Sequence, residues 1–322
     1  DAGQTVDYSI TAGSLPTGLS LNGTTGVISG TPTAGGETLT ITASDGSGGS
    51  NPRTFDLPIV QATGGSVSVI DGKITHIFET SDDLIALTEI SNAEWLVVGG
   101  GGGGAPGSGP NSNAPGGGGG AGGYRSGLQN EKTAGSATPE ATLTIAAGTV
   151  AVVVGAGGTT QSPGSNSQST SGGDSYITGY ATAIGGGHGG RSTTGGNGIT
   201  YAADNGGSGG GDGTNVTPGT GIAGQGFDGT TGDGGNGGQG GSSLQDADNT
   251  NIVGEGYNPG VFSSFTGTAV EYAAGGGGGR YGNNQPGQNA GNFGSGAGGG
   301  DGNLGGNDTG NGVDGVVVIR YV

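Results

Sequence analysis

The 322-residue sequence contains no cysteine, few cationic residues and few aromatic ones. Without cysteine it can form no disulfide framework, no thiolate metal site and no cysteine nucleophile. Seven Lys and Arg residues against 25 Asp and Glu residues give a net charge of −18, so nucleic acids and anionic membrane surfaces would repel the chain. No apolar run approaches the roughly 20 residues that span a bilayer. We therefore expect no nucleic-acid partner and no membrane insertion.

Glycine is the residue the sequence has in abundance, with 88 copies. A glycine costs about 1 kcal/mol relative to alanine in a helix interior, and no long stretch has a 3.6-residue apolar period, so we expect almost no α-helix. A collagen triple helix requires a strict Gly-X-Y period, which is absent here. A chain so rich in glycine is often disordered. Order therefore has to be argued from how the glycines are distributed.

The first sixty residues have the pattern of a small β-sandwich. Residues 38–43 alternate strictly, with Leu39, Ile41 and Ala43 on one face. Phe55, Leu57 and Ile59 repeat the two-residue period of a half-buried strand. Turn sequences such as Asp45-Gly46 separate these segments. An antiparallel sandwich with one buried and one solvated face is the fold this pattern favours.

Two motifs in this region are specific: LPTGLSL at 15–21 and TGVISGTP at 25–32. Together they resemble the immunoglobulin-like repeats of bacterial and phage surface proteins. The resemblance implies an immunoglobulin-like spacer over residues 1–61, which would hold a terminal domain away from a surface. The pattern starts only at Thr5–Ile10, so we expect that the module lacks its first strand and that the natural chain continues upstream of Asp1. Residues 62–65 are predicted to be a linker and residues 66–322 a second, glycine-rich domain.

The glycine runs of the second domain repeatedly follow β-prone segments. Residues 95–98 lead into 99–104, residues 150–154 into 155–158, residues 181–184 into 185–187, and residues 270–274 into 275–279. A flexible linker has no reason to follow an apolar segment each time. We therefore expect each strand to continue into an ordered run of polyglycine II, a helix with three residues per turn and no internal hydrogen bonds.

In a bundle of such helices the backbone itself would form the core. Every N–H and C=O points outward and has to find a partner on a neighbouring run. Only glycine lets the backbones approach closely enough, because a Cβ would block the contact. Alanine and serine within the runs are expected to face outward. The predicted fold is all-β plus polyglycine II, a β-framed bundle of helices behind the N-terminal sandwich.

Several segments in this order resemble the glycine-rich domain of phage tail fibres and receptor-binding proteins. They are HIF at 76–78, WLVVGGGG at 95–102, GGGGGAGGY at 116–124, VVVGAGG at 152–158, YAAGGGGG at 272–279 and GVVVIRY at 315–321. The resemblance covers nearly all of residues 66–322, and the order of the motifs carries it. It implies a location on a virion tail or at an extracellular surface, with a host surface receptor and other copies or an upstream fibre protein as partners.

The segments between the glycine runs are the candidate binding loops, because a rigid framework with variable loops is typical of recognition proteins. Aromatic and arginine side chains supply binding energy at small entropic cost. The candidate receptor contacts are Tyr257, Arg280, Tyr281, Tyr124, Arg125, Arg191 and Tyr201. For each of them a structural role in sealing the flanks of the bundle is the alternative. A glycan would suit aromatic faces and the Asn-rich loops.

No catalytic, cofactor or metal site is predicted. At this glycine content the motif G-x-G-x-x-G arises by chance, and no lysine follows a glycine-rich loop as a P-loop requires. His76 and His188 are too few for a three-histidine zinc site, and we expect His188 to be a surface side chain. The acids beside glycines, Asp212, Asp233 and Asp301, lack the period of a calcium repeat, which leaves only an adventitious calcium site as an alternative.

The function expected from these observations is receptor binding by a piece of a phage tail fibre or tail tip. Its receptor would be a glycan or an outer-membrane protein of the host cell. A structural subunit of a bacterial extracellular filament or surface layer is the alternative. An enzyme such as a depolymerase is a more distant one, because nothing among the 25 carboxylates indicates an acid–base pair.

Overall fold

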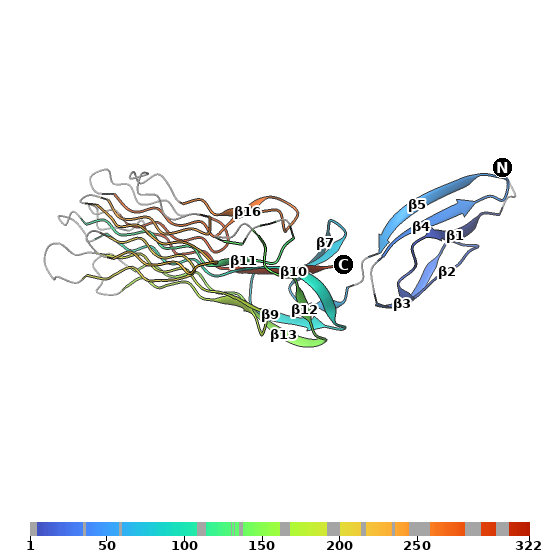
Figure 1. Ribbon diagram of the computed structural model, residues 1–322, viewed down its shortest axis with the longest axis horizontal. Coiled ribbons are helices and arrows are strands. Elements are labelled where there is room, and N and C mark those ends of the chain that lie inside the picture. Colours follow the sequence, from blue (N-terminus) through green and yellow to red (C-terminus); the bar gives the residue numbers. More distant parts are fainter. Residues whose placement is uncertain are drawn as a thin grey trace.

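The computed structural model describes residues 5–34, 37–57, 60–107, 114–129, 131, 133–134, 138–161, 168–191, 200–213, 217–233, 236–244, 258–280, 291–300 and 309–322. Within these ranges the chain consists of antiparallel strands and irregular runs, with no helix. Figure 1 shows the first five strands at the N-terminal end and long runs extending away from the sheets of the second domain. The prediction of a mainly β chain is confirmed.

The N-terminal module consists of two small antiparallel sheets. One has the order β1-β4-β5, formed by Asp7–Ala12, Glu37–Ser44 and Ser50–Leu57, and the other pairs β2 (Thr17–Leu21) with β3 (Ile28–Ala34). Leu39 of β4 is buried, as the alternating pattern predicts. Phe55 departs from its predicted half-buried position: it is 45% exposed, on a strand that pairs with β4 on one side only.

The second domain begins with two sheets that pack face to face. One has the order β11-β10-β18-β8-β7 and the other β15-β14-β13-β9-β6. The strands of the first are β7 (Ser66–Ile70), β8 (Lys73–Phe78), β10 (Ile90–Val98), β11 (Tyr124–Ser126) and β18 (Val316–Tyr321), and β12 (Leu143–Ile145) also pairs with β10. Those of the second are β6 (Ala62–Thr63), β9 (Asp82–Ala86), β13 (Gly148–Val153), β14 (Ser175–Ile177) and β15 (Ala181–Ala183). A separate hairpin pairs β16 (Val261–Ser263) with β17 (Val270–Tyr272).

The predicted linker at 62–65 is partly wrong. Ala62 and Thr63 form β6, which pairs with Ala86 and Ile85 of β9, and Ala62 is fully buried. Ala62 joins the core because its small side chain fits between the two sheets. Residues 62 and 63 therefore belong to the sheet that contains β9.

Two central strands, β10 and β18, are buried on both faces. Trp95 and Val97 of β10 pack between the two sheets, while Leu96 and Val98 pack on the opposite side with the β16–β17 hairpin. The strands are paired antiparallel, with Val98 opposite Val316. Because side chains alternate along a strand, this near-continuous apolar sequence belongs to a strand covered on both sides.

Beyond β10 the hydrogen-bond pattern changes from two directions to three. In the run 99–105, residues 99, 102 and 105 donate to carbonyls of the run 117–123, residues 100 and 103 to Gly173 and Thr170, and residues 101 and 104 to Val313 and Gly310. The neighbouring run that accepts the hydrogen bond therefore changes from one residue to the next and recurs every three residues. A strand would alternate between two sides with a period of two.

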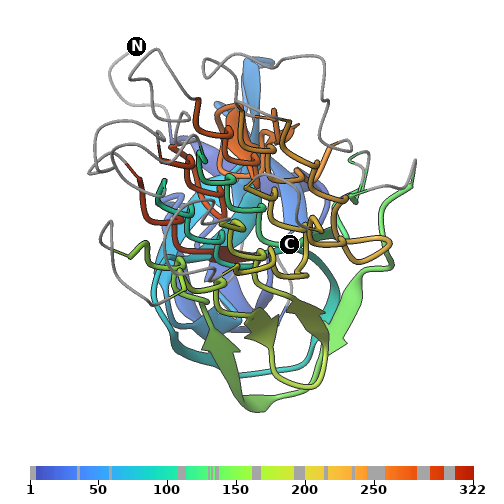
Figure 2. The same cartoon turned by 90° about the vertical axis from the view of Figure 1, so that its left-hand side faces the viewer.

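The carbonyls of the same run are used in the same way. Gly100 and Gly103 accept from the run 186–189, Gly101 accepts from Gly158, and Gly102 and Ala105 accept from the run 297–300. The run 116–123 is surrounded likewise, with donors to 184–190, 238–241 and 294–300. Figure 2, viewed along the runs, shows them packed side by side around one another. The core of this part of the molecule is made of backbone.

At the edge of the bundle, polar side chains replace the missing backbone partners. Gly157 N–H donates to Asp314 Oδ1 at 2.7 Å, and three residues later Thr160 N–H donates to Asn311 Oδ1 at 2.9 Å. The same three-residue period thus appears in the side chains. Buried or half-buried amides at the edge are paired in this way instead of being left without a partner.

The expected outward orientation of alanine and serine in the runs is wrong in most cases. Ala121 and Ala297 are fully buried, and Ala121 packs in the apolar cluster beneath β16–β17. Ser295 is also buried, and its Oγ accepts from Ala274 N–H at 3.4 Å. Ala156 is exposed as expected. Small side chains therefore fill gaps where the bundle meets the apolar cluster.

The packing predicts which glycines are indispensable. A Cβ at Gly102 would overlap with the carbonyl oxygen of Gly187, and neither backbone can move without breaking its own hydrogen bonds. We expect Gly102→Ala to lower the free energy of unfolding by about 3 kcal/mol or more. Denaturant unfolding monitored by tryptophan fluorescence measures this, and amide exchange of the run 99–105 gives a second readout.

Gly291→Ala is the matched control for Gly102→Ala. A Cβ at Gly291 meets nothing within 4 Å, and the residue is exposed. We expect its unfolding free energy to change by less than about 0.5 kcal/mol. Equal effects of the two substitutions would contradict the backbone-packed core.

Candidate functional site

The glycine runs share one end that lies away from the sheets, here called the distal end and defined by Ala105, Gly190, Gly279 and Gly300. Hydrogen bonds set these residues at one level: Gly300 N–H donates to Ala105 O, and Gly279 N–H donates to Gly116 O. Gly116 N–H in turn donates to Gly300 O. Runs that leave the sheets from different strands therefore arrive at the distal end together (Figure 1).

Two of the predicted contact residues, Arg191 and Tyr201, face each other at this end. Their backbones form an antiparallel bridge with reciprocal hydrogen bonds of 2.9 and 2.8 Å. Arg191 is 5% exposed, whereas Tyr201 is half-buried. Burial lowers the pKa of the Arg191 guanidinium, and the nearby Tyr201 opposes this effect. The bridge holds the backbones of the two residues side by side at this end of the bundle.

A third predicted contact, Arg280, lies at the distal end directly after Gly279. Its backbone is bridged to Asn236, whose side chain donates to Asp233 Oδ1 at 2.8 Å. Arg280 is half-buried, and Asp233 is exposed. A guanidinium, an amide and a carboxylate are thus borne by neighbouring backbone segments at this end of the bundle.

A group of hydroxyl side chains at the same end was not predicted from the sequence. Thr160 Oγ1 donates to Gly104 O at 3.1 Å, and Ser169 Oγ donates to the same carbonyl at 2.8 Å. Thr160 Oγ1 also bonds Thr309 Oγ1. The sequence signal that could have indicated this group is Thr160, which lies just after a glycine run. Threonine is frequent between the runs, however, so this position is not distinctive.

Two predicted contacts, Tyr124 and Arg125, lie at the sheet end instead. Tyr124 is fully buried beside Tyr272, with ring centroids 6.4 Å apart, and its burial raises the pKa of its hydroxyl. Arg125 binds both carboxylate oxygens of Glu140 and lies 5.6 Å from the Trp95 ring centroid. These contacts stabilise the fold, which is the alternative role that the sequence leaves open for both residues.

The remaining two predicted contacts, Tyr257 and Tyr281, lie outside the described residues, as does Asp301. His188 was expected at the surface but is 7% exposed within the bundle, where its Nδ1 lies 3.0 Å from Gly189 O.

Asp212 is buried, and its Oδ1 accepts from Gly232 N–H at 3.2 Å. Over the described ranges, no three His, Asp or Glu side chains are grouped closely enough to hold a metal ion.

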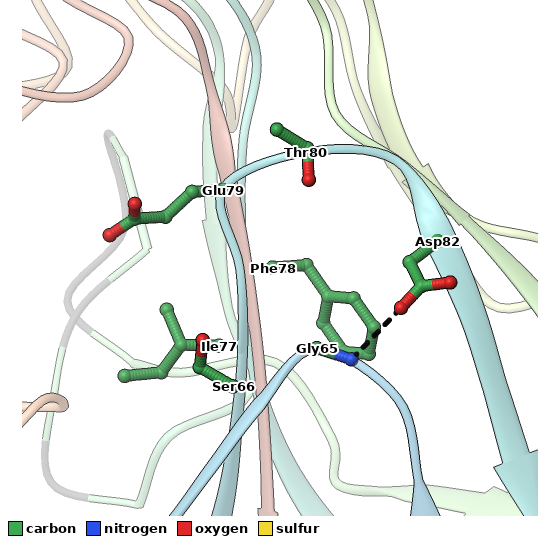
Figure 3. A pocket seen from close by; sticks show the side chains of 7 residues that line it. All are labelled: Gly65, Ser66, Ile77, Phe78, Glu79, Thr80 and Asp82. Carbon is green, nitrogen blue, oxygen red and sulfur yellow. Dashed lines mark hydrogen bonds between the residues drawn. The ribbon is translucent and has the colours of Figure 1, made fainter.

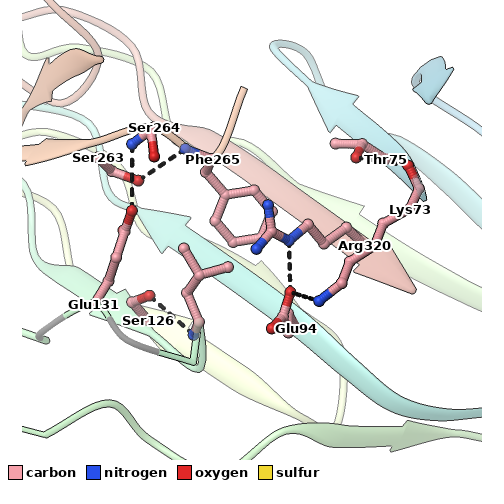
Figure 4. A network of polar contacts seen from close by, with 10 residues as sticks. Lys73, Thr75, Glu94, Ser126, Glu131, Ser263, Ser264, Phe265 and Arg320 are labelled. Carbon is pink, nitrogen blue, oxygen red and sulfur yellow. Dashed lines mark hydrogen bonds and ion pairs between the residues drawn. The ribbon is translucent and has the colours of Figure 1, made fainter. Parts of the chain in front are cut away.

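Two further cationic residues of the sheet end, Lys73 and Arg320, share one carboxylate in an ion network (Figure 4). Glu94 Oε2 binds Lys73 Nζ at 2.8 Å and also Arg320 Nε, and Glu94 is 6% exposed. The Arg320 guanidinium lies 4.7 Å from the centroid of the Phe265 ring. Burial opposes ionisation of Glu94, but hydrogen bonds from Lys73 and Arg320 outweigh it and hold the pKa below its usual value.

A small pocket lies where β8 turns towards β9, lined by Gly65, Ser66, Phe78, Glu79 and Asp82 among others (Figure 3). Its floor is the Phe78 ring, and Asp82 Oδ2 accepts from Gly65 N–H at 3.2 Å. Gly65 has a φ of 58° and Gly64 a φ of 120°, conformations that favour glycine. The pocket thus forms around the tight entry of the chain into the domain.

The comparisons with known proteins agree with this two-part architecture. The fold is that of a mainly β protein with an immunoglobulin-like N-terminal module, since residues 1–60 match the family described as "Putative Ig domain". Residues 80–322 match the family of the glycine-rich domain, and the chain belongs to that family. No curated protein matches the sequence. Over the described residues there is no helix of the length and apolarity that a membrane span requires.

The Glu94 network predicts an acid-sensitive contribution to stability. The pKa of Glu94 is lowered on folding, so its contribution is complete above a pH of about 4.5 and is lost as the pH falls below that value. Glu94→Gln leaves Lys73 and Arg320 without their carboxylate. We expect it to lower the free energy of unfolding by about 3 kcal/mol at neutral pH and to flatten the acid limb of the stability profile.

Denaturant unfolding between pH 7 and pH 3 measures both effects. Glu89→Gln is the control, because Glu89 is exposed and the substitution removes the same charge. We expect the control to behave like the unmodified protein. An equal loss in both variants would show that net charge, and not the ion network, is responsible.

Proposed function

We propose that this protein is a phage tail-fibre or tail-tip adhesin piece, in which the distal end of the glycine-rich bundle binds a receptor on the host cell surface. The residues proposed to contact the receptor are Arg280, Tyr281, Tyr201 and Tyr257, while the buried Arg191 holds Tyr201 in place through their backbone bridge. One observation carries this proposal: Arg280 and Tyr201, both predicted from the sequence as contacts and both only half-buried, lie at one end of an ordered bundle.

We further propose that the glycine runs are polyglycine II helices. The three-residue rotation of hydrogen-bond partners supports this, because three residues per turn is the period of that helix. The described glycines of the runs 99–104 and 116–123 have no φ in the positive range, as a left-handed helix of this type requires. A bundle of this kind would be rigid, because every turn is bonded to several neighbours.

The distribution of positive charge supports a binding role for Arg280. Lys73 and Arg320 bind Glu94, and Arg125 binds Glu140, so these three are committed to the sheet end. A chain with a net charge of −18 carries few cations, and Arg280 is a half-buried one at the distal end. Arginine and tyrosine are enriched among residues that dominate binding energy. A surface glycan or an outer-membrane protein is the proposed receptor.

The test is binding of the fluorescently labelled full chain to whole cells of a panel of bacterial strains. We expect saturable binding to at least one strain, and a tenfold or larger loss of apparent affinity for Arg280→Ala, because truncating a central interface arginine costs about 2 kcal/mol or more. Arg53→Ala is the control, since Arg53 is an exposed arginine on β5 of the spacer module. Equal losses in the two variants, or no saturable binding to any strain, would count against the proposal.

The alternative is a structural subunit of a bacterial extracellular filament or surface layer. The observation that favours it is the N-terminal sheet β1-β4-β5, in which β5 carries the exposed Phe55 and, among the described residues, pairs on one side only. An open strand edge can accept a strand from another subunit. Sedimentation velocity at increasing protein concentration tests this, and a species that stays monomeric at the highest concentration would argue against it.

A further inference from the structure

A buried histidine and a buried tyrosine hold the segment that connects the two modules. Tyr321 of β18 and His76 of β8 lie between the two sheets, and both are almost completely buried. Tyr321 Oη accepts from the backbone N–H groups of Gln61 and Ala62, at 3.1 and 3.0 Å. His76 Nδ1 lies 2.8 Å from Gly64 O. The segment 61–64, which contributes β6 to one sheet, is therefore bound by two side chains from the other sheet, the one that contains β8 and β18.

The same two side chains bind each other. His76 Nε2 lies 3.0 Å from Tyr321 Oη, and the two rings are stacked with their centroids 5.6 Å apart. A phenol oxygen offers one proton and two lone pairs. Its lone pairs accept from Gln61 and Ala62, so its proton has to go to His76 Nε2.

The hydrogen-bond partners therefore assign a single tautomer to His76. Gly64 O can only accept, so Nδ1 carries the hydrogen, and Nε2 accepts the proton of Tyr321. This neutral imidazole satisfies every polar atom of the cluster. A second proton, on Nε2, would point at an oxygen whose lone pairs are already used, and the tyrosine proton would lose its acceptor. An unpaired buried polar group of this kind is costly.

The charged side chains around this cluster do not compensate a positive charge on His76. Lys73 of β8 and Arg320 of β18 both bind Glu94 of β10, and by strand alternation all three lie on the opposite face of their sheet from His76. Asp82 at the start of β9 accepts from Gly65 N–H. The neighbouring residue of β7, Val67, is not titratable.

We propose that His76 and Tyr321 form a proton-operated latch that fixes the connecting segment 61–64 to the glycine-rich domain and releases it in mildly acidic solution. In the latched state the segment contributes β6 to the sheet and sets how the chain enters the domain. In the released state the segment 61–64 is no longer bound to the domain, and the connection between the spacer and the bundle becomes flexible.

The sign of the effect follows from the linkage between protonation and release. Burial lowers the pKa of His76, and its hydrogen bond to Gly64 only partly opposes this. A histidine freed from the cluster regains its ordinary pKa near 6.5 and binds a proton more readily. The latched state is thus fully favoured above a pH of about 6.5. Below that value the released population rises by up to tenfold per pH unit.

The primary experiment is amide hydrogen exchange of residues 61–65 in the full chain between pH 7.5 and pH 5.0, corrected for the pH dependence of intrinsic exchange. We expect protection of Gln61 and Ala62 to fall by up to tenfold per pH unit below about pH 6.5, while the amides of the run 99–105 stay protected. Constant protection of the segment over this range would overturn the proposal.

Four variants separate the latch from other causes. His76→Gln should leave weak protection with no pH dependence, and Tyr321→Phe should release the segment at every pH. His188→Gln is the matched control, because His188 is also a buried histidine but lies within the bundle. Asp82→Asn should keep the pH dependence; its loss there would assign the effect to the carboxylate and overturn the role of His76.

A direct titration covers the case in which His76→Gln fails to fold. The ring proton signals of His76 and His188 are followed by NMR in the unmodified chain, with His188→Gln used for assignment. We expect the His76 ring to titrate below 6.5 and together with the exchange of Ala62. Titration of His76 without any change at Ala62, or exchange that changes while His76 stays neutral, would each refute the latch.

Discussion

The structure depends on one contact, the hydrogen bond between backbone amides and carbonyls of glycine runs that lie too close together for any side chain. Each run points its N–H groups in three directions, and each direction has to be filled by a neighbour. A Cβ at most positions of the runs 99–104 and 116–120 would overlap with a neighbouring carbonyl. Low hydrophobic content is therefore no obstacle to order, because backbone pairing at close range takes over the role that apolar side chains have in ordinary cores.

Such a bundle still needs something to set its register, and the sheets provide it. The strands β10 and β18 are paired with Val98 opposite Val316, and both are buried on two faces. Gly99 directly continues β10, while Gly315 directly precedes β18. The residue of each of these two runs that adjoins the sheet is thus placed by a strand whose register is fixed by apolar packing. Along the rest of each run, the hydrogen-bond partner changes with a period of three residues, and no side chain is needed to set that period.

This division explains which features could be predicted from the sequence. The recurrence of a β-prone segment before a glycine run is local, so the bundle and the strands that frame it could be predicted. Contacts distant in sequence could not: His76 and Tyr321 are 245 residues apart, and nothing in either local pattern indicates the other. Tyr124 is predicted as a contact because it is an aromatic residue between glycine runs, but the run before it ends at the sheet end, where Tyr124 fills an apolar cluster. Whether a run ends at the sheet end or at the distal end decides whether the residue after it packs in the core or lies at the distal end.

The three-residue period also imposes a rule on length that separates the bundle from the segments between its runs. Inserting one residue into a run would turn every following N–H by about a third of a turn, towards a different neighbour, and shift it by about 3.1 Å. The antiparallel partners in the bundle, such as residues 99, 102 and 105 with 123, 120 and 117, would then all be lost at once. A segment that leaves the bundle at one distal residue and returns at another carries no such constraint. Its length and composition can change while the runs beneath it keep their register, which is the property a surface for varied binding partners requires.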